Sequence, residues 1–242
     1  MVISISNHNI DSINSKKSTN GRFVANYSRE NTIINNGSVN NTTEENETFS
    51  QVALKARAFL DAGYKNLGKV ADDRTTGDEW RDKVQLTKLD RRSLYAIASN
   101  EGGLFSQAEI SAASFPVEEL HTKSTRAANR FGNDPAAVFK ASIDLMDGAS
   151  PEEKASLKWI QGRAAAQAGY ESLMRDRHPD RVPADVKTHN PIIDLFATAW
   201  EELSSKRYGT HSVEDMPSWS KALSQWHIHN EGSAQSRTIG YL

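Results

Sequence analysis

The sequence contains no cysteine among its 242 residues, which excludes disulfides, thiolate zinc sites and a cysteine nucleophile. No run approaches the ~20 apolar residues that a membrane-spanning helix requires. Walker A, GxGxxG, GxSxG, EF-hand and HExxH patterns are also missing, so we expect neither a cofactor nor a metal ion. A net charge of −2 gives no broad attraction to nucleic acid.

Asparagine is concentrated at the start of the chain. Residues 1–48 hold 11 of the 17 asparagines, mixed with serine and threonine and only scattered isoleucines and valines. So little apolar surface cannot offset the backbone ordering entropy of roughly 1–2 kcal/mol per residue. We therefore predict a disordered, polar leader over residues 1–48, which is either a passive tail or a signal.

The interpretation of the leader as an export signal depends on its first ten residues, MVISISNHNI. They have neither the basic region nor the apolar region of a Sec signal peptide. Their Ser- and Asn-rich composition resembles the unfolded leaders of bacterial type III secretion substrates. Such a resemblance implies export through a narrow channel, which an unstructured polar start would enter easily.

From Phe49 onward the chain shows apolar residues at helical spacing and no convincing alternating strand pattern. We predict an all-α fold, a compact bundle of about seven helices over residues 49–230, followed by a flexible tail at 231–242. Ser50 is a plausible N-cap of the first helix, and the last helix is expected to run from Pro217 to about Trp226.

Several helix boundaries carry strong capping signals. Ser106 and Glu109 have the capping-box spacing. Asp134, Ser150 and Asn190 each precede a proline, which combines an N-cap with the residue favoured at the first helical position. We expect Ser150 to open the helix that contains Trp159, and residues 175–186 to form a long internal loop.

Glu101 is the one candidate for a catalytic role. It follows an apolar helix and precedes Gly102 and Gly103, a placement similar to that in lysozyme-like lytic enzymes. The resemblance implies a carboxylic acid with a raised pKa that protonates a glycosidic oxygen. The downstream turn of those enzymes and a second carboxylate are missing, so an exposed Glu at a helix end is the competing interpretation.

Other polar and aromatic groups suggest binding rather than catalysis. His227 and His229 could supply two metal ligands, but one intervening residue suits a strand rather than a helix. Arg175, Arg177 and Arg181 lie in a proline-bounded stretch and could bind an acidic partner. Trp219 and Trp226 lie in an amphipathic end segment, where they either pack in the core or anchor a partner.

These observations favour a non-enzymatic bacterial protein-interaction protein, an effector (and so a virulence factor) or accessory factor secreted through a type III-like, non-Sec route. Its partner would be a protein, with Arg175, Arg177, Arg181, Trp219 and Trp226 as the expected partner-binding residues. One alternative is a peptidoglycan-acting hydrolase with Glu101 as general acid. A second alternative is a cytoplasmic helical domain with a dispensable tail.

Overall fold

The computed structural model describes residues 47–206 and 211–239, and for residues 231–239 the backbone alone. The predicted disordered leader therefore lies outside the described residues, apart from Glu47 and Thr48, which are not helical. The chain from Phe49 onward forms one compact unit.

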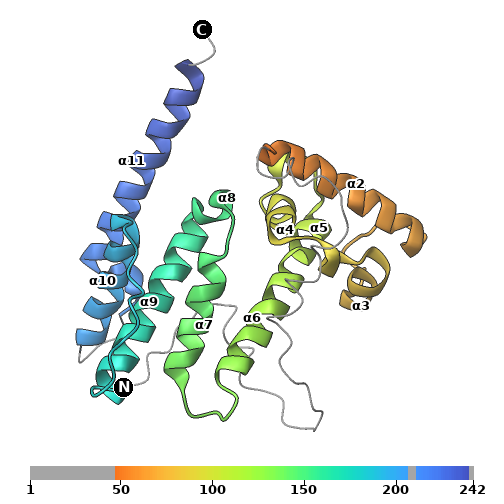
Figure 1. Cartoon of the computed structure of the whole chain (residues 1–242). Coiled ribbons are helices and arrows are strands. Elements are labelled where there is room, and N and C mark those ends of the chain that lie inside the picture. The colour runs from red at the N-terminus through yellow and green to blue at the C-terminus, as the bar shows by residue number, and fades with distance from the viewer. Residues whose placement is uncertain (1–46, 207–210, 240–242) are drawn as a thin grey trace, which may run out of the picture. The chain divides into compact units, whose positions relative to one another are not determined.

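Every regular element among the described residues is helical, which confirms the predicted all-α bundle (Figure 1). Seven of the described α-helices have eight or more residues, in agreement with the expected number. In chain order the elements are α2 (Phe49–Leu67), α3 (Gly77–Glu79), the π-helix η2 (Trp80–Val84), η3 (Leu86–Lys88), α4 (Arg91–Ala98), η4 (Glu101–Gly103), α5 (Gln107–Ala112), α6 (Ser114–Ala128), α7 (Pro135–Asp147), α8 (Pro151–Lys154), α9 (Leu157–Arg177), α10 (Pro191–Ser205), η5 (Val213–Asp215) and α11 (Pro217–Ile239). None of the helices described is long and apolar enough to cross a membrane.

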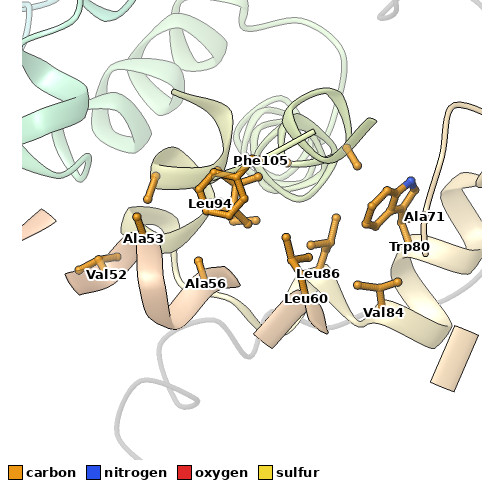
Figure 2. Close-up of a cluster of buried hydrophobic side chains, with 14 residues drawn as sticks. Val52, Ala53, Ala56, Leu60, Ala71, Trp80, Val84, Leu86, Leu94 and Phe105 are labelled. Carbon is orange, nitrogen blue, oxygen red and sulfur yellow. The ribbon is translucent and has the colours of Figure 1, made fainter. Parts of the chain in front are cut away.

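The first half of the bundle is built around α2 and α4. Val52, Ala56 and Leu60 recur on one face of α2 and are buried against Leu94 and Ile97 of α4. The segment that follows α2 closes this core from the side with Trp80, Val84 and Leu86 (Figure 2). Burying this apolar set is what holds the short helices α3 to η3 in place, because so few residues cannot form a stable isolated helix.

The second half of the bundle consists of α7, α9, α10 and α11. Helices α7 and α9 are antiparallel, since the Trp159 indole near the start of α9 donates to the Met146 carbonyl near the end of α7, with 2.9 Å between the two atoms. Phe196 of α10 is fully buried and packs edge-on against Trp219 of α11, with ring centroids 4.7 Å apart. Helix α9 packs closely against both α7 and α10, because small residues, Ala164 to Ala166 among them, cover its surface.

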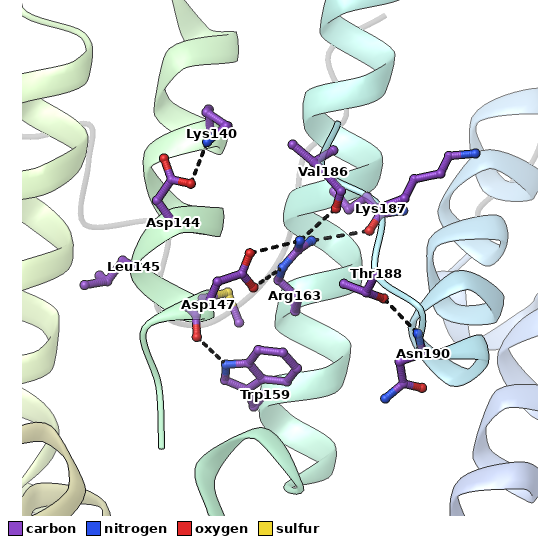
Figure 3. Close-up of polar contacts among 12 residues, drawn as sticks. Lys140, Asp144, Leu145, Asp147, Trp159, Arg163, Val186, Lys187, Thr188 and Asn190 are labelled. Atoms are coloured by element: carbon purple, nitrogen blue, oxygen red, sulfur yellow. Dashed lines mark hydrogen bonds and ion pairs between the residues drawn. The ribbon is translucent and has the colours of Figure 1, made fainter. Parts of the chain in front are cut away.

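The connection between α9 and α10 runs back along α9. The Ala184 amide donates to the Tyr170 hydroxyl at 2.9 Å, and further along the connection the Val186 carbonyl accepts from Arg163 at 2.8 Å. Arg163 is 1% exposed, and its guanidinium also bridges both oxygens of Asp147 (Figure 3). A buried guanidinium thus satisfies the backbone of a segment that has no helix or strand partner of its own.

Several predicted boundaries are corrected. Ser50 lies inside α2, where its hydroxyl donates to Glu101. Ser150 opens only the short α8, and Ser156 caps the Trp159 helix, because the chain turns between them. The long connection begins at His178, since α9 continues to Arg177. Helix α11 extends to Ile239, well beyond the expected end near Trp226 and through most of the predicted flexible tail.

Candidate binding hollow

An open hollow of about 260 Å³ lies between the short helices after α2 and the start of α6. Its apolar lining comes from Trp80, Leu86, Phe115 and Pro116. Trp80 and Leu86 belong to the core and are 3% and 2% exposed, whereas the Phe115 side chain is 49% exposed. The hollow therefore has a fixed apolar floor and one large apolar side chain within reach of a partner.

The floor of the hollow is shaped by the π-helix η2. The Gln85 amide donates to the Trp80 carbonyl, five residues back, and Gln85 itself adopts a left-handed conformation with φ 66°. Such wide turns are rare and occur frequently at functional sites. The segment approaches α2 at Gly63, where an added Cβ would lie 2.9 Å from Val84 Cγ1. Glycine at this position allows the close contact between α2 and η2.

Charged side chains form the rim of the hollow. Arg81 contacts Asp78, and its Nε lies 3.2 Å from an oxygen of Asp82. On the opposite side, Glu119 lies 2.7 Å from the Lys123 ammonium. All of these groups are substantially exposed, so their mutual ion pairs are weak and can be exchanged for pairs with a partner.

A buried polar network supports the hollow from behind. Glu109 is 3% exposed and accepts hydrogen bonds from Tyr64 Oη, from the Ser106 amide at 2.6 Å and from Arg57 Nη1 at 2.6 Å. Tyr64 in turn packs edge-on against Trp80, with centroids 6.4 Å apart. The carboxylate that the sequence identifies as a capping-box residue therefore also fixes the orientation of the aromatic floor.

The electrostatics of this network follow from its geometry. Burial alone would raise the pKa of Glu109, but the hydrogen bonds from Tyr64, the Ser106 amide and Arg57 outweigh burial and lower it. For Tyr64, burial and the hydrogen bond to the Glu109 carboxylate together raise the pKa of the phenol. At neutral pH the network therefore holds an ionised Glu109 and a neutral Tyr64.

Glu101 lies apart from the hollow. It begins η4, directly after Asn100, and α4 has already ended at Ala98, with Asn100 left-handed (φ 53°) after the C-cap; Gly102 and Gly103 also have positive φ but lie within η4, beyond the end of that helix. The Glu101 carboxylate is half-buried and accepts a hydrogen bond from Ser50 Oγ at 2.8 Å. This contact ties the turn to the start of α2, and Glu101 is not among the residues that line the hollow.

The three predicted arginines lie together at the end of α9 and in the turn after it. Arg175 and Arg177 are in the last turn of the helix, where cations favour the helix dipole, and Arg181 follows four residues later. Arg175 lies 3.6 Å from Asp176 and 3.9 Å from Glu201, and Arg181 lies 3.8 Å from Asp134; all three arginine–carboxylate contacts are long and substantially exposed. Such contacts leave the guanidinium groups accessible.

The two predicted tryptophans belong to the core cluster shared by α9, α10 and α11. Trp219 packs on Phe196, and Trp226 is half-buried beside Leu223. His227 and His229 are both exposed on α11, and no group of three or more His, Asp or Glu in the described part of the chain could hold a metal ion. Both tryptophans therefore pack against the core, and a role in binding a partner stays a prediction.

No protein-family model, curated protein or solved structure matches this chain. The class that the coordinates define is an all-α helical domain with a concave apolar hollow. Sequence reasoning missed this hollow, because Trp80 and Phe115 are 35 positions apart and each reads as an ordinary core residue. The one local signal was an aromatic, Phe115, directly before a proline at a helix start.

Proposed function

We propose that this chain is a non-enzymatic bacterial interaction protein, an exported effector or accessory factor of a type III-like system. Its helical domain would bind a protein partner at the hollow. The observation that carries this proposal is the combination of an apolar floor at Trp80 and Leu86, the half-exposed Phe115 and the exposed charged rim. A partner would insert an apolar side chain and present a basic group to Asp78 or Glu119.

Site-specific photocrosslinking in the producing bacterium tests the partner-binding half. A photoreactive residue replaces Thr87, which lines the hollow, and in a control protein it replaces Thr198, which is exposed on α10. We expect a defined protein adduct from position 87 alone, and we expect Phe115→Ser to remove it. Leu54→Ser, at a similarly exposed apolar position on α2, should leave the adduct intact.

Equal adducts at both positions, or an adduct that survives Phe115→Ser, would contradict binding at the hollow. Far-UV circular dichroism of the Phe115→Ser protein shows whether its fold is intact.

A secretion assay tests the export half. Deleting residues 2–30 should lower the extracellular level of the protein while its intracellular level is maintained. An unchanged extracellular level would reject the leader as an export signal, and an absence of the full chain from the medium would favour the cytoplasmic alternative, in which the tail is dispensable.

The hydrolase alternative rests on Glu101 and its half-buried position. It requires the purified protein to clear peptidoglycan in a turbidity assay and Glu101→Gln to abolish that clearance. The non-enzymatic proposal expects no clearance from either protein. Ser50→Ala, which removes the hydroxyl bonded to Glu101 but no carboxylate, is the matched control.

A further inference from the structure

One end of the helical domain carries the two most exposed large hydrophobic side chains among the described residues. Phe131, in the turn between α6 and α7, is 85% exposed, and Val182, in the connection after α9, is 95% exposed. Single exposed hydrophobic residues are common and require no explanation. Two of them at the same end of a fold, each on a turn, form a distinct feature.

Helix directions bring these two turns together. Helix α7 is antiparallel to α9, so the start of α7 meets the end of α9 (Figure 1). At that end Asp134, the N-cap of α7, lies 4.0 Å from His178 Nε2 and 3.8 Å from an Arg181 nitrogen. Phe131 is three residues before this aspartate, and Val182 directly follows the arginine.

Exposed arginines flank each of the two hydrophobic side chains in the sequence. Arg126 comes from the last turn of α6 and Arg130 from the turn that follows it, and Arg177 and Arg181 come from the end of α9 and the turn after it. Arg130 lies over the Phe131 ring, with its guanidinium carbon 6.0 Å from the centroid. Arg175 is not counted, because Asp176 lies 3.6 Å away and balances its charge. Against the four arginines stand Asp134 and Asp180, so the end carries an excess of positive charge.

This arrangement differs from the hollow in shape and in charge. The two hydrophobic side chains project from the end of the domain and are not among the residues that line the hollow. The neighbouring cations are guanidinium groups, which bind phosphate oxygens through paired hydrogen bonds. Projecting apolar groups that enter the headgroup region, with basic groups level with the phosphates, are how peripheral proteins bind anionic membranes.

We propose that the end of the domain formed by Arg126, Arg130, Phe131, Arg177, Arg181 and Val182 docks on the surface of an anionic phospholipid bilayer. Phe131 and Val182 would enter the interface, and the four arginines would contact lipid phosphates. This docking is independent of partner binding at the hollow and needs no helix that spans the membrane.

Vesicle co-sedimentation of the full chain tests this proposal. The vesicles are phosphatidylcholine alone, or phosphatidylcholine mixed with an equal part of phosphatidylglycerol, and a tube without vesicles corrects for aggregation. We expect binding to the mixed vesicles only. Arg177→Gln with Arg181→Gln should weaken it by about fivefold per arginine, and Phe131→Ser with Val182→Ser by about tenfold or more.

The matched control is the pair Val70→Ser with Arg74→Gln. Val70 is 74% exposed and Arg74 is exposed nearby, in the segment between α2 and α3, so this variant makes the same kind of change elsewhere. It should bind as the parent does.

Four results would overturn the proposal: no sedimentation with mixed vesicles, equal sedimentation with neutral vesicles, an equal loss in the control variant, or full binding by the Phe131→Ser, Val182→Ser protein. The last result would mean that the arginines bind anions without membrane insertion.

Discussion

Glu109 shows how much one buried carboxylate can determine in a small helical domain. It closes the capping box of α5, accepts from Arg57 and accepts from the Tyr64 hydroxyl two turns further along α2, so its two oxygens join α5 to α2. A buried charge is tolerated only when such partners replace the lost water. The orientation of Tyr64, and through it of Trp80, depends on this side chain.

Replacing Glu109 with Gln should lower the free energy of unfolding by about 1–3 kcal/mol, because one donor is left unsatisfied and the pairing with Arg57 is lost. Asp61 is the matched control, since it also pairs with Arg57, at 2.8 Å, but its side chain is 63% exposed. Asp61→Asn should cost less than about 0.5 kcal/mol. Urea unfolding at neutral pH measures both, and equal losses would show that the buried position of Glu109 has no special weight.

The lowered pKa of Glu109 gives a pH dependence of defined sign. A carboxyl group whose pKa is lower in the folded protein stabilises the fold above its unfolded value of about 4.5. That contribution is lost as the pH falls from this value through the folded-state pKa. The difference in unfolding free energy between the parent and Glu109→Gln should therefore be constant near neutral pH and shrink below about pH 4.5. A difference that grows on acidification would contradict the assignment.

At the scale of the element, capping signals were the most reliable guide. Asp134 and Asn190 cap the helices that the sequence predicts, Ser150 is an N-cap but only of the short α8, and the Ser106–Glu109 capping box is confirmed. These signals act within four residues, so a sequence contains all the information they need. The π-helix at Trp80, the return of residues 178–190 along α9 and the buried Arg163 were not predictable, because each depends on contacts between distant segments.

Whether a candidate site could be predicted also depends on whether its residues are close in the sequence. The arginines at 175, 177 and 181 could be predicted as one accessible patch, since they are neighbours in the sequence. The hollow could not be predicted, since its floor and its wall come from η2 and α6. The position of Glu101 at a helix end could be predicted, but not its contact with Ser50, 51 residues away.

Two glycines of α9 provide a test of how closely helices pack. A Cβ at Gly169 would lie 2.5 to 2.9 Å from three ring atoms of Phe139 on α7, so Gly169→Ala requires the ring or the helix to move. We expect a net loss of about 1–2 kcal/mol, because the strain exceeds the helix propensity gained, which is ~1 kcal/mol. Urea midpoints measure the effect.

Gly162→Ala is the control in the same helix. Its Cβ would meet only the terminal methyl of Met146, at 3.1 Å, and a methionine end group moves easily. We expect this variant to be neutral or up to about 1 kcal/mol more stable. A shift of equal size and sign for both glycines would show that α7 and α9 are less closely packed than the structure indicates.

At the scale of the whole domain, the apolar core is divided. One buried cluster comprises residues between Val52 and Ala113, and the clusters of the second half comprise residues between Ala136 and Ala222. Helices α6 and α7, which pack on each other, connect the two halves, and His121 Nε2 lies 2.9 Å from Ser142 Oγ across this pair. Arg91 of α4 also donates to the Leu145 carbonyl of α7. A further link is polar and lies between α4 and α8.

Two neighbouring ion pairs form that polar link, which we call the α4–α8 clasp. Arg91 binds both oxygens of Glu153, at 2.7 and 2.8 Å, and Arg92 binds both oxygens of Glu152, at 2.6 and 3.2 Å. All four side chains are less than a third exposed. Burial would raise the pKa of Glu152, yet the hydrogen bonds from Arg92, from its own backbone amide and from Ser150, with the charge of Arg92, together outweigh burial and lower the pKa.

Breaking the clasp should therefore uncouple the halves rather than unfold either core. For Arg91→Gln with Arg92→Gln we expect a loss of about 1–3 kcal/mol and a broader urea transition, because each half keeps its own apolar cluster. Hydrogen exchange should show amides of α2 and α4 opening at a different urea concentration from those of α9 and α10. Arg81→Gln, which breaks ion pairs whose side chains are all more than half exposed, is the control and should leave a single sharp transition. A clasp variant that still unfolds in one step, with all amides opening together, would show that the packing of α6 on α7 is sufficient to couple the two halves.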